Sequence, residues 1–430
     1  MKRNSLSILI LLLITLFVIP MTVSANGGQD EMTTEEAEKV TFFHYFSGTL
    51  SGGMDDLVET FNEENPEYDL AHTPVEHEAF KTSIMVMLSG GNPPDLFSYW
   101  AGSRVQFIVD ADRLTPIDDV YEEYGVSKLF SEAVNGAATY NGHKYFLPLT
   151  QHYVAFFYNK EVFAKAGIAA APETWAEFQD ACEKIKAIGV APIALGSKNR
   201  WPAQFWLDYP LLRTAGPEYR AKLMAGEVSY TDPEVVKAFE LWKECIDKDY
   251  FYPNANAYDY AEATVLVGTG EAAMTLMGSW MMQLDDQIGW APGEDYDFFP
   301  FPVVDTSIPD TAVGPFDGVV IAKDARNPEA AKKALIAMAQ TEPMIAFNTG
   351  TGALAPNVNV PASMYNVLQL KIKDYCAVVP NWAFNYDLAT PPPVADVGLD
   401  AFTEFIDSPE NYMQILKKTE EGAKAAWGNM

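Results

Sequence analysis

The chain has 430 residues, of which 59 are acidic and 29 are basic, and its formal net charge at pH 7 is −30. This charge excludes nucleic acid as a partner and disfavours binding to anionic membrane surfaces. A single hydrophobic core stops growing at about 250–300 residues, so a chain of this length is expected to fold as two lobes. The three cysteines, Cys182, Cys245 and Cys376, are too few and too scattered for a disulfide framework or a zinc site. We predict no metal and no cofactor.

The N-terminus has the pattern of a secretory signal peptide. Lys2 and Arg3 precede an apolar run at residues 6–19, and a small-residue cleavage site ends at Ala25. We expect a signal peptide at residues 1–25, a flexible mature N-terminus at 26–39, and export to the periplasm or, alternatively, to the extracellular space. No cysteine follows the apolar run until Cys182, so we predict a protein without a lipid anchor.

Strands alternate with helices in the part of the chain that follows. Apolar, β-favouring runs predict strands at residues 40–46, 68–75 and 95–100. Between them, apolar residues with helical spacing predict helices around Met54–Phe61 and at residues 79–88. This order is typical of a parallel α/β sheet and predicts one lobe.

A second lobe is predicted after residue 150. Thr174 and Glu177 have the spacing of a capping box, which predicts a helix that buries Phe178 and Cys182. The helix is followed by a predicted strand at residues 191–195. Further helices with apolar faces alternate with short apolar runs up to the C-terminus, so the second lobe is also expected to be α/β.

Residues 270–280, GEAAMTLMGSW, carry the strongest single indication of a binding site. Ala272–Met277 reads as a buried strand, and Gly278 permits a sharp exit that places Trp280 beyond the strand end. Open α/β sheets bind ligands outside the carboxyl ends of their strands. Trp280 is therefore a candidate ligand contact, with a core tryptophan under a loop as the alternative.

Three blocks, in this order, resemble the extracellular solute-binding proteins of ABC sugar importers, the family of maltose-binding protein. The first is the proline-containing segment 144–148 with Tyr158-Asn159-Lys160, and the second is residues 270–280. The third comprises residues 313–321 and 327–333. In the family these blocks correspond to three crossings between two lobes.

The resemblance implies an α/β, two-lobe periplasmic-binding-protein fold of type II, with three crossover strands and a ligand cleft between the lobes. Lobe 1 would contain residues 40–150 and 279–315, and lobe 2 residues 151–278 and 316–430. The protein would be a monomer that captures a carbohydrate by hinge closure. It would deliver this sugar to the ABC permease subunits in the inner membrane.

The resemblance also implies a set of substrate-binding residues in the loops at strand ends and at the crossings. These are Phe46, Ser47, Trp100, Ser103, Arg104, Gln151, His152, Arg200, Trp201, Trp280, Asp317 and Trp382. Ser103 stands where the family carries an acid, which removes a strong hydrogen-bond acceptor. Several separated tryptophans in the set indicate more than one sugar ring, and so an oligosaccharide.

Each of these assignments has an alternative in ordinary structure. Phe46 and Ser47 can form a simple turn, and the tryptophans can belong to the lobe cores. Arg104 can form a surface salt bridge, His152 can pack in the hinge, and Asp317 can cap a turn.

The chemistry of a sugar supports the set. A pyranose has an apolar C–H face and a rim of hydroxyls, so its site needs flat aromatic platforms together with donors and acceptors. Aromatic residues make up 13% of the chain. A binding protein for a polyol, a phosphodiester or iron remains an alternative, as does a secreted carbohydrate-active enzyme. No Gly-x-Ser-x-Gly, His-Glu-x-x-His or Walker motif occurs, so we expect no enzyme.

Overall fold

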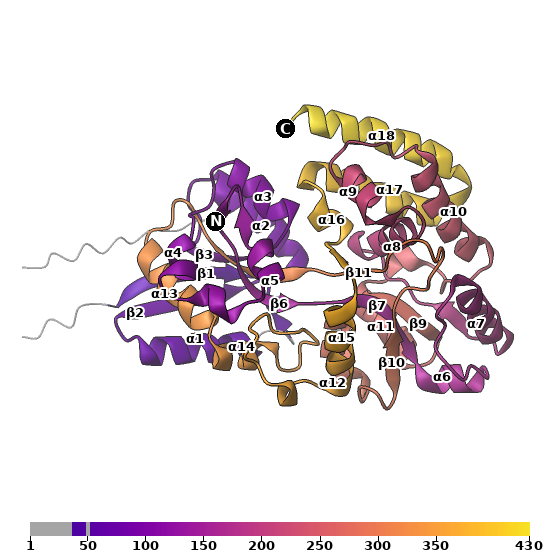
Figure 1. The fold of residues 1–430 in the computed structure, drawn as a ribbon, viewed down its shortest axis with the longest axis horizontal. Coiled ribbons are helices and arrows are strands. Elements are labelled where there is room, and N and C mark those ends of the chain that lie inside the picture. The colour runs from indigo at the N-terminus through magenta and orange to yellow at the C-terminus, as the bar shows by residue number, and fades with distance from the viewer. Residues whose placement is uncertain (1–36, 49–51) are drawn as a thin grey trace, which may run out of the picture. The chain divides into compact units, whose positions relative to one another are not determined.

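Two β-sheets, each with its own hydrophobic core, organise the part of the chain that the structure describes (Figure 1). The structure is a computed structural model that describes residues 37–48 and 52–430. The predicted signal peptide and residues 26–36 of the predicted mature N-terminus lie outside these ranges. We call the region around the first sheet the first lobe and the region around the second sheet the second lobe.

The first sheet has the strand order β2-β1-β3-β12-β6. Its strands are β1 (Glu38–His44), β2 (Tyr68–Pro74), β3 (Leu96–Trp100), β6 (Leu147–Gln151) and β12 (Phe316–Ile321). β1 pairs in parallel with β2 and β3, whereas β12 runs antiparallel to β3 and β6. The carboxyl ends of the three parallel strands therefore meet at one edge of the sheet. β1 begins at Glu38, so the last two residues of the expected flexible segment belong to a strand.

The second sheet has the order β13-β11-β7-β9-β8, with β10 pairing with β7 outside this path. Its strands are β7 (Val154–Asn159), β8 (Ala191–Ile193), β9 (Ala272–Gly278), β10 (Tyr296–Phe299), β11 (Thr311–Val313) and β13 (Asn381–Ala383). β7 and β9 are antiparallel, and every residue of β9 is buried. A small two-stranded sheet joins β4 (Thr139–Tyr140) to β5 (His143–Lys144).

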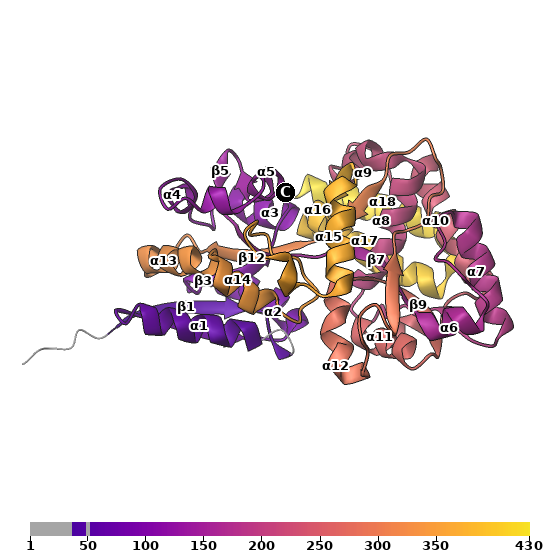
Figure 2. The same cartoon turned by 60° about the horizontal axis from the view of Figure 1, so that its bottom comes forward.

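Helices cover the first sheet on both faces (Figures 1 and 2). They are α1 (Gly52–Glu64), α2 (His77–Ser89), α3 (Ser103–Asp110), α4 (Asp118–Glu122), η2 (Val126–Leu129), α5 (Glu132–Ala137), α13 (Pro328–Met338) and α14 (Thr341–Asn348). Their apolar residues pack with Phe42, Phe97 and Val320 of the strands into one core. Burial of these side chains is the main stabilising contribution to the lobe.

The second lobe contains the remaining helices. They are α6 (Lys160–Lys165), α7 (Trp175–Ala187), η3 (Trp201–Gln204), α8 (Phe205–Thr214), α9 (Gly216–Met224), α10 (Pro233–Asp247), η4 (Ala255–Ala257), α11 (Tyr260–Gly268), η5 (Ser279–Leu284), α12 (Asp285–Ile288), η6 (Ala362–Met364), α15 (Val367–Val378), α16 (Tyr386–Ala389), α17 (Pro392–Asp407), η7 (Pro409–Asn411) and α18 (Tyr412–Gly428). Phe156 and Trp206 lie at the centre of its core. None of the helices in the described ranges is long and apolar enough to cross a lipid bilayer.

The start of α7 confirms the predicted capping box. The Thr174 hydroxyl accepts the backbone N–H of Glu177, and the Glu177 carboxylate accepts the backbone N–H of Thr174. Both bonds satisfy amides that a helix start leaves without an intrahelical partner. The cap orients α7 so that Phe178 and Cys182 are buried, as predicted. Cys182 and Cys245 are buried free thiols.

The lobe boundaries differ from the expected ones after residue 278. β10 and β11 belong to the second sheet, and β12 with α13 and α14 belongs to the first lobe. This is the reverse of the assignment of residues 279–315 to lobe 1 and of 316–348 to lobe 2. The reason is that residues 270–280 do not cross between the lobes. After β9 the chain buries Met281 and Met282 in the second core and returns through β10 along β7.

The chain passes between the lobes at three other places in the described residues. It leaves β6 for β7 at His152–Tyr153, and β11 for β12 at Gly314–Pro315. It then leaves α14 and reaches α15 through residues 349–366, where Leu354 bridges to Gln151. The first two connections are short and lie side by side, because the backbone N–H of His152 donates to the carbonyl oxygen of Pro315 at 3.1 Å.

Candidate functional site

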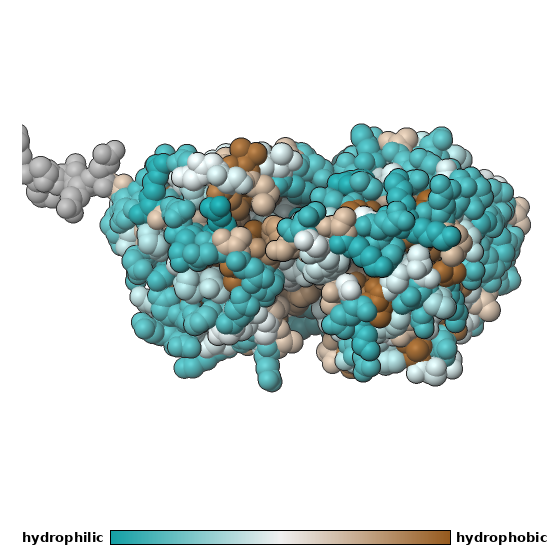
Figure 3. Space-filling model, turned by 90° about the horizontal axis from the view of Figure 1, so that it is seen from above, coloured by the Kyte–Doolittle hydropathy of each residue, from teal (hydrophilic) through white to brown (hydrophobic). Residues whose placement is uncertain are grey.

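A cavity of about 330 Å³ lies between the two lobes. It is lined by Tyr45, Phe46, Ser47, Gly48, Glu76, His77, Lys81, Trp100, Arg104, Thr150, His152, Trp201, Gln204, Tyr260, Trp280, Gln283, Pro315, Asp317, Phe347, Asn385, Asp387 and Leu388. In the view from above, the surface is hollowed between the lobes and their outer faces are mostly hydrophilic (Figure 3). The carboxyl ends of β1, β2 and β3 point to this space, the usual ligand position in α/β sheets.

The first lobe supplies a stack of aromatic rings. Tyr45 follows β1 and Trp100 ends β3, and their rings stack with centroids 4.4 Å apart and planes 7° apart. His77, the first residue of α2, meets both rings edge-on, at 5.4 Å from Tyr45 and 5.3 Å from Trp100. The parallel pairing of β1 with β2 and β3 brings these three strand ends together.

The second lobe supplies a facing group of aromatics. Trp201 of η3 and Trp280 of η5 have ring centroids 5.7 Å apart, and Tyr260 of α11 lies 5.6 Å from Trp201. The ring centroids of His77 and Trp201 are 6.4 Å apart, so the aromatic groups of the two lobes meet at this point. Aromatic rings on two sides of a cavity can hold the apolar faces of a flat, ring-shaped ligand.

Gly278 is required by close approach rather than by an unusual backbone conformation. Its φ is −81°, which any residue can adopt. A β-carbon at this position would lie 1.9 Å from the ring of Trp280. The ring therefore packs directly on the end of β9, and this contact fixes its direction into the cavity.

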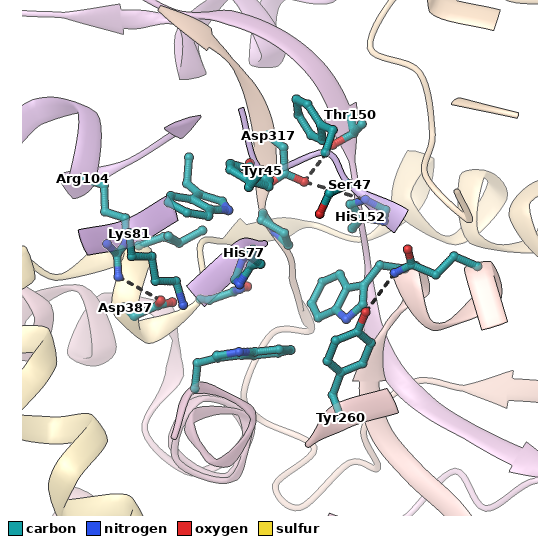
Figure 4. A pocket seen from close by; sticks show the side chains of 18 of the residues that line it. Tyr45, Ser47, His77, Lys81, Arg104, Thr150, His152, Tyr260, Asp317 and Asp387 are labelled. Atoms are coloured by element: carbon teal, nitrogen blue, oxygen red, sulfur yellow. Dashed lines mark hydrogen bonds and ion pairs between the residues drawn. The ribbon is translucent and has the colours of Figure 1, made fainter. Parts of the chain in front are cut away.

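A buried carboxyl group lies where β12 and β6 meet. Asp317 accepts hydrogen bonds from the Tyr45 hydroxyl at 3.0 Å and the Thr150 hydroxyl at 2.8 Å (Figure 4). Burial raises its pKa to about 6 in spite of these two bonds. His152 Nε2 lies 3.7 Å away, and burial lowers the pKa of His152 to about 3. His152 is therefore neutral near pH 7, and its Nδ1 is 3.0 Å from the hydroxyl of Ser279.

The basic side chains of the cavity are paired with carboxylates. Lys81 Nζ lies 3.0 and 3.1 Å from the two carboxylate oxygens of Glu78. Arg104 Nη2 lies 3.3 Å from Asp387 Oδ2, and its guanidinium lies over the ring of Trp100 at 5.4 Å. The cavity therefore has no cation without an acidic neighbour among its described lining residues.

Eight of the predicted site residues line the cavity: Phe46, Ser47, Trp100, Arg104, His152, Trp201, Trp280 and Asp317. Their contact with a ligand stays a prediction. Arg104 and Asp317 reach the cavity while also making the ion pair and hydrogen bonds described above.

The other four predicted residues have different surroundings. The Ser103 hydroxyl donates to the carbonyl oxygen of Ala389 at 2.9 Å. Gln151 pairs through its backbone with Leu354. Arg200 points to Asp396 and Asp400 on α17.

Trp382, the last of these four, lies in β13 and packs against Phe316 with ring centroids 5.9 Å apart. It also lies close to Gly314, where a β-carbon would be 2.9 Å from the indole ring. Its surroundings are those of a packing residue beside a connection between the lobes.

Several polar lining residues were not predicted from the sequence. These are Tyr45, Glu76, His77, Lys81, Thr150, Gln204, Tyr260, Gln283, Asn385 and Asp387. Glu76 and His77 come soon after β2 ends at Pro74, so the strand-end argument that was applied to Trp280 would also have indicated them. Gln204 and Asn385 lie in segments with no local pattern that indicates a site.

Comparisons with known proteins agree with this geometry. The sequence profile described as bacterial extracellular solute-binding protein matches residues 47–345, well over half of the chain. An uncharacterised ABC transporter extracellular-binding protein of Pyrococcus horikoshii is 31% identical over 374 residues, which cover 84% of this chain and 83% of that protein.

Solved structures show the same relationship. The bacterial solute receptor AcbH, described as having an exclusive substrate preference for β-D-galactopyranose, has a TM-score of 0.84 and 28% identity, and the match covers 91% of this chain and 99% of that one. A chitin oligosaccharide binding protein has a TM-score of 0.83 and 25% identity, with the same coverage of both chains. The two-lobe fold expected from the sequence is thereby confirmed. The chain belongs to the bacterial extracellular solute-binding protein family.

Proposed function

We propose that this protein is the substrate-binding component of an ABC importer and that its ligand is an uncharged carbohydrate. The single observation that carries the proposal is the cavity between the lobes. It has aromatic rings on both sides, and its cations are already paired with carboxylates. The sugar-binding relatives, AcbH and the chitin oligosaccharide binding protein, support the same class of ligand.

The paired charges argue against a phosphodiester or another anion. Binding a phosphate needs cationic or backbone N–H donors that are free to face it. Lys81 and Arg104 are held by Glu78 and Asp387, and burial keeps His152 neutral. A polyol or sugar instead needs hydroxyl-binding groups, and Asp317, Gln204 and Asn385 provide them.

The volume of the cavity bears on ligand size. Small-molecule sites span about 300–1,000 Å³, so a cavity of about 330 Å³ is at the low end of this range. We therefore favour a ligand of one or two sugar rings over a longer oligosaccharide.

A ligand screen tests the proposal. The protein is melted with D-glucose, D-galactose, D-xylose, maltose, cellobiose and N,N′-diacetylchitobiose, with glycerol 3-phosphate as the anionic comparison. A ligand at a hundredfold excess over its Kd stabilises the folded state by about 2.7 kcal/mol. At least one sugar should raise the melting temperature without being altered. Stabilisation by glycerol 3-phosphate alone would contradict the proposal, and turnover of a sugar would indicate an enzyme.

Solution scattering tests the mechanism. A sugar that touches both lobes binds the closed arrangement better and shifts the population toward it. The radius of gyration should stay constant or fall when the sugar found in the screen is added, and it should never rise. A rise on saturation would rule out capture by closure.

We further propose that the protein acts in the periplasm after removal of residues 1–25, as a monomer without a lipid anchor. The expected partner is the membrane permease of an ABC importer, the role indicated by the extracellular-binding relative. Mass spectrometry of the native protein should give a mature N-terminus near Asn26. A diacylglycerol adduct would contradict this proposal.

A further inference from the structure

The first five residues of α2 contain a chain of three interacting side chains. Lys81 Nζ contacts both carboxylate oxygens of Glu78, and Glu78 Oε1 lies 2.8 Å from Nδ1 of His77. His77 and Lys81 both line the cavity, and Figure 4 shows His77 near the middle of the view, beside the group that contains Lys81, Arg104 and Asp387. The chain connects a partly buried ion pair to a ring that lines the cavity.

These contacts decide which nitrogen of His77 carries the proton. Burial alone would raise the pKa of Glu78, but its bonds with His77 and Lys81 outweigh this effect and lower the pKa to about 2. An ionised carboxylate only accepts hydrogen bonds, so Nδ1 of His77 must donate. Burial and the charge of Lys81 lower the pKa of His77, so the ring is neutral and Nε2 has a free lone pair.

Nε2 is available to a ligand. Within residues 37–48 and 52–430, Nε2 makes no hydrogen bond. It is also not buried, since the buried side-chain atoms without a partner do not include it. The ring is held edge-on against Tyr45 and Trp100, and it meets Trp201 of the other lobe. Its position is therefore fixed by packing as well as by Glu78.

We propose that His77 is a specificity-determining residue: Glu78 holds its imidazole as the Nδ1–H tautomer, and its Nε2 accepts a hydrogen bond from a hydroxyl group of the bound ligand. The contact selects a ligand that offers a donor at this position and disfavours one that offers only acceptors, because two acceptors facing each other leave both without a partner. The ligand contact rests on the proposed function, whereas the tautomer does not.

The tautomer is tested without any ligand by NMR of the protein labelled with ¹⁵N-histidine. The spectrum of wild type at pH 7 should show an unprotonated Nε2 and a protonated Nδ1 for His77, assigned by loss of the signals in His77→Gln. In Glu78→Leu the two tautomers should mix. A protonated Nε2 in wild type, or no change in Glu78→Leu, would overturn the assignment.

His143 is the matched control for this measurement. Its Nδ1 lies 3.0 Å from Asp118 Oδ2, as in the His77–Glu78 pair, but the ring is exposed and lies outside the cavity. Its tautomer should respond to Asp118→Leu in the same way. Its signals should not move when a sugar is added.

The ligand contact is tested with the sugar that gives the largest melting shift in the screen. Adding it should shift the Nε2 signal of His77 and leave that of His143 unchanged. His77→Phe keeps an aromatic ring but loses the acceptor, so affinity should fall by about tenfold to a hundredfold. His77→Gln presents an amide oxygen and should recover part of the loss, while His143→Phe should bind like wild type.

The outcomes separate the two proposals. An unmoved Nε2 signal, or wild-type affinity in a folded His77→Phe, would overturn the role of His77 even though a sugar binds. If none of the sugars binds, the proposed function fails. The proposed ligand contact then fails with it, whereas the spectra still decide the tautomer.

Discussion

Arg104 of the first lobe and Asp387 of the second form an ion pair at the cavity, with Nη2 and Oδ2 3.3 Å apart. Only 13% and 9% of the two side chains are exposed, so water and salt screen the pair little. Beside it, Ser103 donates to the carbonyl oxygen of Ala389. Both contacts join the start of α3 to the region of α16, which packs into the second core through Tyr386 and into the first through Leu388, so they hold the lobes together on this side of the cavity.

Arg104→Met is expected to open the unliganded protein. Removing one partner of a buried pair costs about 3–5 kcal/mol, which exceeds the gap of a few kcal/mol that commonly separates two conformations of one protein. The radius of gyration without ligand should increase relative to wild type. Arg200→Met is the control, because Arg200 pairs with Asp396 and Asp400 inside the second lobe. Equal scattering curves for Arg104→Met and wild type would contradict the role of this pair.

Trp280→Ala should weaken ligand binding while leaving the fold intact. Trp280 is partly exposed and lines the cavity, and buried aromatic contacts of this kind contribute roughly 2–4 kcal/mol to binding. Trp206→Ala is the matched control, since Trp206 is fully buried in the core of the second lobe. That change should cost about 3–5 kcal/mol of stability. Titration calorimetry and thermal melting should therefore separate the two variants, and a collapse of the melting temperature in Trp280→Ala would place this residue in the core.

The buried carboxyl of Asp317 should make stability depend on pH. Its folded pKa of about 6 is above the unfolded value, so the folded state holds the proton more tightly. The stabilisation of the folded state by this tighter proton binding is complete below the unfolded pKa of about 3.9. It is lost as the pH rises through about 6. Asp317→Asn should gain on the order of 2 kcal/mol relative to wild type between pH 4 and pH 7. Melting curves across this range check it, and parallel curves for the two proteins would contradict the shifted pKa.

A buried ion pair in the second lobe holds the segment that carries Asn385 and Asp387. Arg220 contacts Asp208 Oδ1 through Nε at 2.9 Å and Nη2 at 2.6 Å. The same Nη2 donates to the carbonyl oxygen of Phe384, and Asp208 Oδ2 accepts the backbone N–H of Tyr386 at 2.9 Å. The pair therefore fixes the backbone on both sides of Asn385.

Arg220→Met should lower both stability and ligand affinity. Arg213→Met provides the control, because Arg213 is equally buried and binds Asp310 and two carbonyl oxygens away from the cavity. Arg220→Met should cost about 3–5 kcal/mol of stability, and Arg213→Met less, because 38% of the Asp310 side chain is exposed. Affinity measured well below the melting temperature should fall only for Arg220→Met. A similar fall in both variants would mean that the loss of affinity follows from general destabilisation.

The sequence was most informative where one local rule decides the structure. Phe46 and Trp100 were expected at the site from the family resemblance, and both line the cavity at the ends of strands in a parallel set. The capping box of α7 was predictable because both of its bonds lie within one helical turn. His77 obeys the same strand-end rule as Trp100, so it could have been found.

Features that depend on distant pairing could not be predicted in this way. The course of the chain after Trp280 depends on whether β10 pairs with β7 or continues into the first lobe, and local pattern does not distinguish these. Trp382 was expected as a ligand platform from the resemblance, and its packing against Phe316 follows from the pairing of β13 with β11, which no local pattern indicates. Asn385 is held at the cavity by the Arg220–Asp208 ion pair. These two residues come more than a hundred positions earlier in the chain, and Arg220 donates to the carbonyl oxygen of Phe384.

The position of β12 has a consequence for how the chain can fold as it is made. β12 lies between β3 and β6, although the other strands of the first sheet all come from residues 38–151. Until residues 316–321 emerge, β3 and β6 each present an edge without this partner, and the first lobe cannot be completed. Early folding is therefore discouraged, and the incomplete lobe is prone to aggregate. We propose that the protein acts in the periplasm, and for an exported chain this late strand would delay folding of the N-terminal half until residues 316–321 have been made.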